Sequence, residues 1–238
     1  MTDGSIQRFV AKTDLTGRTV QSVRLGDFYP RQVCEGTEGT VWVLGFESNY
    51  GYSADANRDL LRHYSFEKGF LNSFVSLDSI SKSSDAILNV SPRKSFLRCS
   101  KDRVSVFFGS AAQYIEVDAS NGKLERWNVA LPPIVGGKAG GFAVTEEGRM
   151  FVSLHGVSEP DNTVTYGLYE LKAEAGTSVA TLIPVNGTIT THDRNGVLPD
   201  ETFEQLWGAD GDELVVHRHG DGWGISWAKV AASPSTPD

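Results

Sequence analysis

The sequence lacks the features that define membrane proteins, disulfide-rich proteins and helical folds. Only two of its 238 residues are cysteine, and no apolar stretch approaches the ~20 residues that a membrane-spanning helix needs. No long amphipathic pattern indicates a helix, and no Gly-x-Ser-x-Gly motif indicates a serine hydrolase. No signal peptide opens the chain, although a chain trimmed from a longer, exported precursor would look the same. The sequence therefore predicts no membrane span and leaves the compartment open.

Positive charge is also scarce. Lysine and arginine total 22 residues against 30 aspartates and glutamates, which gives a formal net charge of −8. Recognition of nucleic acid through a general basic field needs an excess of positive charge. A nucleic-acid partner is therefore not expected.

The two cysteines are too few to form a disulfide framework, and no spacing of cysteine and histidine matches a structural zinc site. Cys34 and Cys99 are predicted to be buried free thiols. A disulfide between them stays open as an alternative, because both fall near the ends of equivalent predicted strands in successive repeats.

Glycine is plentiful, and four of the 25 glycines mark a recurring turn. Gly17, Gly69, Gly122 and Gly176 are spaced 52, 53 and 54 residues apart, and each lies between two short apolar runs. Two such runs joined by a few polar residues that end in glycine predict a β-hairpin, because glycine reaches positive φ without steric cost. A spacing of about 50 residues is typical of repeat folds.

A second pair of predicted strands precedes the hairpins at Gly69, Gly122 and Gly176, and a further pair lies near the C-terminus. Apolar runs such as Val41–Leu44 follow short polar turns, and further apolar runs precede those turns. Four antiparallel strands in each unit, which we call a, b, c and d, are typical of a β-propeller blade. The predicted fold is therefore an all-β propeller with about four to five blades visible. Its predicted parts are a half blade at 1–25, blades at 26–77, 78–131, 132–185 and 186–230, and a disordered tail at 231–238.

Two ways of ending the ring stay open. The N-terminal strand Thr19–Leu25, with Val20, Val23 and Leu25 as core residues, can complete the C-terminal blade and so remove two exposed edges. The alternative is that the chain is part of a longer propeller whose first blades lie upstream.

The repeated unit resembles those of bacterial β-propeller repeat proteins, loosely the six-bladed NHL-repeat and gluconolactonase-like groups. The resemblance rests on the run Glu38–Val43, followed by Leu61–Ser65 and the glycine turn at Gly69, and it covers nearly the whole chain. It implies the architecture more than any one family. Metal-dependent members use glutamate, asparagine and aspartate in the central channel, but no motif transfers those roles to positions of this sequence.

The connections between strands b and c, and those between d and the next a, are long in several repeats. In a propeller these connections lie on the same face, and loops on a rigid scaffold commonly carry binding residues. The predicted ligand-binding face carries Tyr50, Tyr52, Asp55, Asn57, Arg58, Arg93, His155, Asp161, Asn162, His192, Asp193 and Arg194. For each of them singly, a solvated loop residue is the alternative.

One local pattern could hold a metal ion. His217 and His219 lie two apart in a predicted strand, so their imidazoles point to the same face. No third ligand is identifiable, and the alternative is two half-exposed histidines near a strand end.

The missing catalytic motif favours a non-catalytic scaffold, without a cofactor, that binds a protein or an extended ligand on the long-loop face. The resemblance implies a different function as the alternative: a metal-dependent lactonase or lyase. Such an enzyme would hold a divalent cation in the central channel through oxygen ligands, with or without histidine.

Overall fold

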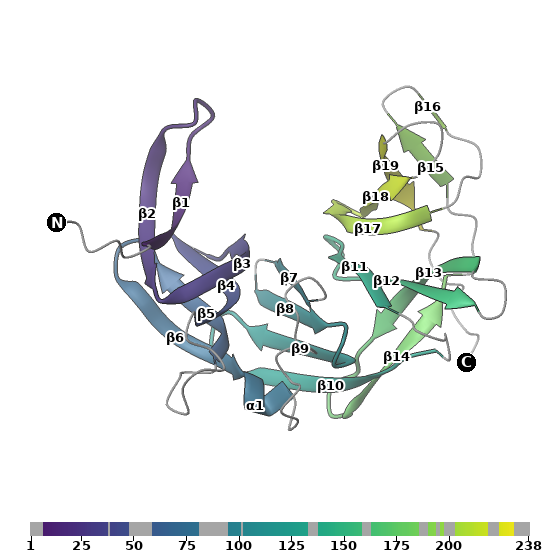
Figure 1. Ribbon diagram of the computed structural model, residues 1–238, viewed down its shortest axis with the longest axis horizontal. Helices are drawn as coiled ribbons and strands as arrows, with labels where there is room; N and C mark the ends of the chain where they lie inside the picture. Colours follow the sequence, from purple (N-terminus) through teal and green to yellow (C-terminus); the bar gives the residue numbers. More distant parts are fainter. Residues whose placement is uncertain are drawn as a thin grey trace. The chain divides into compact units, whose positions relative to one another are not determined.

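The computed structural model has an all-β fold, as predicted, in which the described part of the chain contains 19 strands and one helical turn, α1 (Leu77–Ile80) (Figure 1). The described residues are 7–37, 39–47, 59–80, 95–100, 102–132, 138–158, 163–185, 190–193, 196–197, 203–218 and 224–230. None of the helical structure in these ranges is long or apolar enough to cross a membrane. The predicted tail, 231–238, lies outside the described residues.

The chain divides into two compact units. Unit 1 comprises Met1–Ala111 and Ile115–Arg126, and unit 2 comprises Ala112–Tyr114 and Trp127–Asp238. The strands that begin in unit 1 are β1 (Arg8–Thr13), β2 (Thr19–Gly26), β3 (Phe28–Glu35), β4 (Thr40–Glu47), β5 (Asp59–Ser65), β6 (Gly69–Ser76), β7 (Ser95–Cys99), β8 (Arg103–Phe108) and β10 (Leu124–Ala130). Strand β9 (Gln113–Asp118) begins in the short segment of unit 2 and ends in unit 1.

The remaining strands belong to unit 2. They are β11 (Lys138–Val144), β12 (Met150–Ser158), β13 (Thr163–Lys172), β14 (Val179–Pro184), β15 (Thr190–Asp193), β16 (Gly196–Val197), β17 (Phe203–Asp210), β18 (Glu213–Arg218) and β19 (Gly224–Lys229). Three consecutive sets of four, β3–β6, β7–β10 and β11–β14, each follow the chain order from one neighbour to the next. Within unit 2, Asn128–Ala130 of β10 also pairs in parallel with Val179–Thr181 of β14.

The prediction of four glycine hairpins is confirmed. Gly17, Gly69, Gly122 and Gly176 have φ values between +72° and +82°, and each one follows a strand whose neighbour in the sheet is the next strand along the chain. A side chain at such a φ is strained, which explains why glycine recurs at this point of each repeat.

The N-terminal hairpin β1–β2 covers a core within unit 1. Val23 and Leu25 of β2 are 5 % and 3 % exposed and belong to one buried cluster with residues of β3, β4 and β5. That cluster also contains Phe28, Val41, Val43 and Tyr64. The expectation that Val20 is a third core residue is wrong, because Val20 is 47 % exposed. Val20 is an odd number of residues from Val23 and Leu25, so it points to the opposite face of the strand.

The C-terminal sheet is completed differently from the closure hypothesis. That hypothesis placed the N-terminal strand Thr19–Leu25 beside the last strand of the chain. The structure instead places β15 there: Thr190–His192 pairs antiparallel with Trp227–Lys229 of β19. Strand β2 is hydrogen-bonded to β1, in a sheet of two strands. Strand β15, which precedes β17–β19 in sequence, therefore occupies the edge of β19 that the closure hypothesis gave to Thr19–Leu25.

Strands β3 and β7 are joined within unit 1, and the prediction of two free thiols is wrong. Cys34 and Cys99 form a disulfide with a Cα–Cα distance of 5.7 Å. Gln32 reinforces the junction, since its side-chain amide donates to the carbonyl of Ser95 (2.5 Å) and its side-chain oxygen accepts from the amide of Leu97 (2.7 Å). The free-thiol prediction failed because it rested on the number of cysteines, whereas the pairing depends on two equivalent strands lying next to each other.

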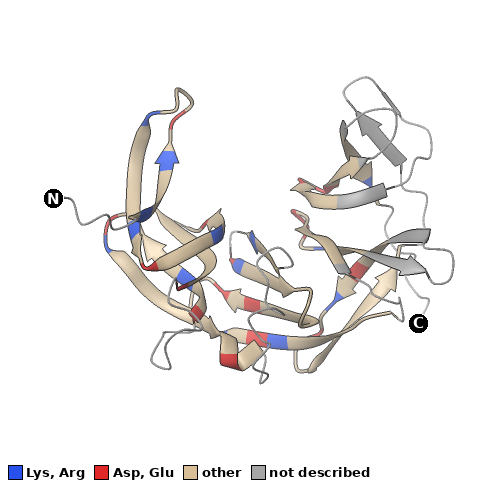
Figure 2. Cartoon of the chain, in the orientation of Figure 1, with Lys and Arg blue, Asp and Glu red and all other residues tan. Residues whose placement is uncertain are grey.

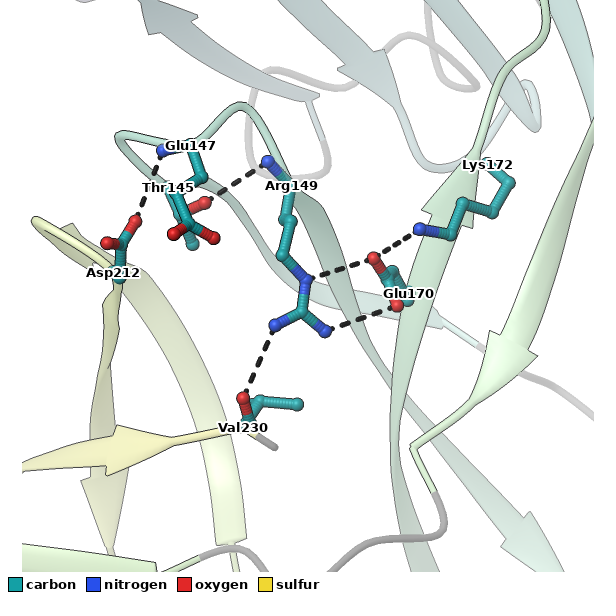
Figure 3. A network of polar contacts seen from close by, with 7 residues as sticks. All are labelled: Thr145, Glu147, Arg149, Glu170, Lys172, Asp212 and Val230. Atoms are coloured by element: carbon teal, nitrogen blue, oxygen red, sulfur yellow. Dashed lines mark hydrogen bonds and ion pairs between the residues drawn. The ribbon is translucent and has the colours of Figure 1, made fainter. Parts of the chain in front are cut away.

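A network of hydrogen bonds and ion pairs connects the β11–β14 set with the sheet that contains β18 and β19 (Figure 3). Arg149, just before β12, donates from Nε and Nη2 to the carboxylate of Glu170 on β13, at 3.1 and 3.3 Å. Its Nη1 donates to the carbonyl of Val230, which directly follows β19. Lys172 donates to the same carboxylate, and the backbone amide of Glu147 donates to Asp212 in the turn before β18. The network thus connects the β11–β14 set with the strands β18 and β19.

Breaking this network should destabilise unit 2. The side chain of Glu170 is 3 % exposed, so Arg149→Ala leaves a buried carboxylate without the ion pair and the two hydrogen bonds that Arg149 supplies. Removing one partner of a buried ion pair costs about 3 kcal/mol or more in the free energy of unfolding. Urea denaturation of the two proteins tests this. Arg103→Ala is the control, because its ion pair with Glu116 is formed by a side chain that is 66 % exposed.

The same carboxylate should contribute to the acid sensitivity of the fold. Burial alone would raise the pKa of Glu170, but the hydrogen bonds from Arg149 and Lys172 outweigh burial and lower that pKa below its ordinary value of 4.5. The folded pKa is then below the unfolded one, so the stabilisation is fully present above pH ~4.5 and disappears as the pH falls through the folded pKa. We expect Glu170→Gln to lose stability at neutral pH and to approach wild type in acid. An equal deficit at all pH values would contradict this assignment.

Candidate binding surface

Two arginines and two aromatic residues form a surface cluster in unit 1, which we call the arginine–aromatic patch: Arg8, Tyr29, Arg31 and Phe46. The rings of Tyr29 and Phe46 are stacked with their centroids 5.6 Å apart. The guanidinium of Arg31 lies 4.7 Å from the Tyr29 centroid and 5.2 Å from the Phe46 centroid, and that of Arg8 lies 5.2 Å from Tyr29. Guanidinium groups at these distances are held by attraction to the faces of the rings.

The local sequence explains how the patch forms. Tyr29 of β3 and Phe46 of β4 are direct partners in register, so their side chains point to the same face of the sheet. Between Pro30 and Gln32 the register shifts, which makes Arg31 the extra residue of a β-bulge. Bulges re-aim side chains, and Pro30 is tolerated because β3 is the edge strand of its sheet.

A glycine on the neighbouring strand allows the close approach at this point. A Cβ atom at Gly45 would lie 2.1 Å from the carbonyl oxygen of Tyr29 and 2.9 Å from the ring of Phe28. Such distances are far inside van der Waals contact, so any other residue at this position would displace Tyr29 from its stack with Phe46. Gly45 therefore supports the patch although its own atoms are not part of it.

Two carboxylates on the strands of the patch are already bound to other cations. Glu35 on β3 accepts from Lys12 on β1 at 2.5 Å, and Glu47 at the end of β4 accepts from Arg62 at 2.7 Å. Among the described residues, no carboxylate lies within 4 Å of the guanidinium of Arg8 or Arg31. Charges of both signs are interspersed over the described strands (Figure 2). Arg8 and Arg31 are therefore distinguished by having no acidic partner among the described residues, and not by a general basic field.

A buried arginine supports the sheet next to the patch. Arg62 on β5 has a side chain that is 10 % exposed, lies 3.7 Å from the carboxylate of Asp59 and stacks over the ring of Phe28 at 4.3 Å. Burial alone would lower the pKa of Arg62, but its hydrogen bonds to Glu47 and Tyr64 raise that pKa above its ordinary value. Arg62 therefore stays charged and keeps Glu47 and Asp59 engaged.

Most of the predicted binding face lies outside the described residues. This applies to Tyr50, Tyr52, Asp55, Asn57, Arg58, Arg93, Asp161, Asn162 and Arg194. Of the others, the structure describes only the backbone: His155 pairs with Lys138 across β12 and β11, and His192 and Asp193 lie on β15. Phe46 and Glu47 immediately precede the connection 48–58, so the patch lies where that predicted binding loop leaves the sheet.

The histidine-pair hypothesis receives a partial answer. His217 on β18 is 6 % exposed, and its ring is stacked on Trp207 of β17 with a centroid distance of 5.4 Å. It is therefore buried and not half-exposed, while His219 lies outside the described residues. Within the described ranges, no group of three or more histidine, cysteine, aspartate or glutamate side chains could hold a metal ion.

Sequence reasoning missed all four residues of the patch. It assigned function to long connections, whereas Tyr29, Arg31 and Phe46 lie within strands. One signal was available: Pro30 lies just before the apolar run that begins at Gln32, and a proline at such a point indicates an edge strand or a bulge, where a neighbouring side chain can turn outward. The stacking itself needs the register of β3 against β4, which the sequence alone does not give.

Comparison with models of known protein families gives no match to this chain, and a search among curated proteins likewise finds no matching sequence. Any function for this chain must therefore be argued from its own residues. The all-β class and the antiparallel sheets are features of the structure itself. These two features do not by themselves identify a propeller or the NHL-repeat family.

Proposed function

We propose that the protein is a β-propeller that acts as a non-catalytic binding scaffold, and that it takes a protein or another extended ligand at the end of the blades where the b–c and d–a connections lie. The observation that carries this proposal is the arginine–aromatic patch, because it offers two arginines that have no acidic partner among the described residues, at that end of the sheet β3–β6. Tyrosine and arginine are enriched among the residues that dominate binding energy at protein interfaces.

The contacts between first strands of successive sets support the propeller. In a propeller, strand a of each blade lines the central axis, so neighbouring a-strands lie side by side. In unit 1 the disulfide joins two such strands, β3 and β7. In unit 2 a Cβ atom at Gly141 of β11 would lie 1.8 Å from the carbonyl oxygen of Leu206, which shows how closely β11 approaches β17. Each unit thus contains a pair of neighbouring a-strands, as expected for a propeller.

Affinity purification with matched baits tests the binding function. Wild-type protein immobilised on a column, exposed to an extract of the source cells, should retain a specific partner. Tyr50→Ala/Arg58→Ala in the predicted loop, or Tyr29→Ala in the patch, should reduce recovery of that partner about tenfold. The loop variant should leave the melting temperature nearly unchanged, because a surface substitution away from the core alters stability by about 0.5 kcal/mol or less.

Arg24→Ala is the control bait, because Arg24 lies next to the buried Val23 and Leu25 and so points to the opposite face of β2. Recovery should be unchanged with this bait. The proposal would fail if wild-type protein retained nothing above a blank column, carried a divalent cation after purification without chelator, and hydrolysed a lactone. Those results would establish the metal-dependent enzyme instead.

A further inference from the structure

We infer that the arginine–aromatic patch binds an extended, acidic segment of a protein partner, with carboxylates of that segment paired to Arg8 and Arg31. This inference rests on the proposed binding function and names its partner class and its contact residues.

The first step concerns charge. Cation–aromatic stacking occupies the faces of the two guanidinium groups but leaves N–H donors at their edges for a further partner. Glu35, Glu47 and Asp59, the acids of the strands β3–β6, are already paired with Lys12 and Arg62. A planar carboxylate can accept two parallel N–H donors from one guanidinium, an arrangement that adds both energy and geometric specificity. The patch is therefore complementary to carboxylates.

The second step concerns preorganisation. Arg31 contacts two rings and Arg8 contacts one, so both side chains are held in place before any ligand arrives. The Nε atom of Arg8 is shielded from solvent and has no hydrogen-bond partner among the described residues. An ordered side chain loses little conformational freedom on binding, which favours the complex. Tyr29 is 40 % exposed and gives the ligand an apolar surface beside the two charges.

The third step concerns the shape of the partner. Strand β1, which supplies Arg8, is an edge strand: among the described strands it is hydrogen-bonded only to β2. Strand β3, which supplies Arg31, is the outer strand of its sheet, and its C-terminal half adjoins β7. Edge strands present backbone N–H and C=O groups that another extended chain can pair with. A polypeptide segment can use these groups and the arginines together. A sulfated polysaccharide or a free phosphate could use only the arginines, so the structure favours a peptide.

The test uses the full chain and a synthetic peptide probe. A fluorescein-labelled peptide of about ten residues, alternating glutamate and threonine, should adopt an extended conformation with its carboxylates on one face. Fluorescence anisotropy should show binding that weakens about tenfold with Arg31→Gln and again with Arg8→Gln, because each variant removes a charge-assisted contact. Tyr29→Leu should also weaken binding, since it removes the ring on which both arginines stack.

Arg24→Gln is the matched control, because it removes one positive charge from the same hairpin on the opposite face of β2. This variant should bind like wild type, and the same peptide with lysine in place of glutamate should not bind. The inference is overturned if Arg24→Gln weakens binding as much as Arg31→Gln, or if the lysine peptide binds equally well. Tighter binding of dextran sulfate with the same dependence on Arg31 would also overturn it and would identify a site for anionic polysaccharides.

The two proposals fail in different ways. If the glutamate peptide does not bind but a cellular partner is still lost with Tyr50→Ala/Arg58→Ala, the inference about the patch is wrong and the binding scaffold stands. If neither the peptide nor any cellular partner is retained, the binding function itself is wrong. Circular dichroism and melting curves of each variant separate loss of binding from loss of fold.

Discussion

Deleting residues 1–26 is expected to turn the protein into aggregating material. The deletion removes Val23 and Leu25 from the core beneath the β1–β2 hairpin, each worth about 1.5 to 3 kcal/mol of burial. It also uncovers Phe28, Val41 and Val43, which are at most 3 % exposed in the intact chain. These losses are comparable to the whole stability of a typical domain. Size-exclusion chromatography of the truncated protein gives the result directly.

Two valines on the same strand provide a sharper form of this prediction. Val23→Ala should lower the free energy of unfolding by about 1 to 3 kcal/mol, because Val23 is 5 % exposed. Val20→Ala, the same change three residues earlier, should alter it by about 0.5 kcal/mol or less, because Val20 is 47 % exposed. A soluble, cooperatively melting truncation, or equal effects of the two substitutions, would show that the hairpin does not cover this core.

Removing the disulfide is expected to lower the free energy of unfolding by about 4 kcal/mol, the chain-entropy value for a loop of this length. The bond joins Cys34 and Cys99 across 65 residues of sequence, so it restricts a large part of the unfolded chain. Urea denaturation of the double variant Cys34→Ser/Cys99→Ser should therefore show a lower midpoint than that of the oxidised wild type. Gln32, which bridges the same two strands by hydrogen bonds, retains only part of the connection.

A reductant separates loss of the bond from damage by the substitutions. Adding a phosphine reductant should lower the denaturation midpoint of wild type to about that of the double variant. The reductant should leave the double variant itself unchanged. Two reactive thiols in oxidised, unfolded wild-type protein would contradict the disulfide and restore the prediction of free cysteines.

The hairpins were predictable because their cause is local. A turn that needs positive φ selects glycine, and alternating apolar residues on both sides mark the strands, so Gly69 and its flanking runs carry the information by themselves. The outer edge of the last sheet was not predictable in this way. Strand β15 pairs with β19 through Thr190–His192, a segment too short to show a strand pattern, and competition between two possible partners for one edge is decided by the folded chain.

The candidate site likewise depends partly on local sequence and partly on the folded structure. The connection 48–58 has the composition of a binding loop, so the sequence predicted binding residues there. The arginine–aromatic patch instead depends on a bulge at Arg31 and on the missing side chain of Gly45, two features that acquire meaning only when β3 is in register with β4. A one-residue change of register would turn Tyr29 away from Phe46.

By itself, then, the sequence determined the strand content, the repeated hairpins and the lack of a general basic surface, because each of these follows from the conformational preference or charge of residues near one another in the chain. The tertiary structure alone decided the pairing of Cys34 with Cys99, the burial of Glu170 beneath Arg149, and the stacking of Arg31 against Tyr29 and Phe46. These properties depend on distances between residues far apart in sequence, and packing sets those distances only after the strands have paired.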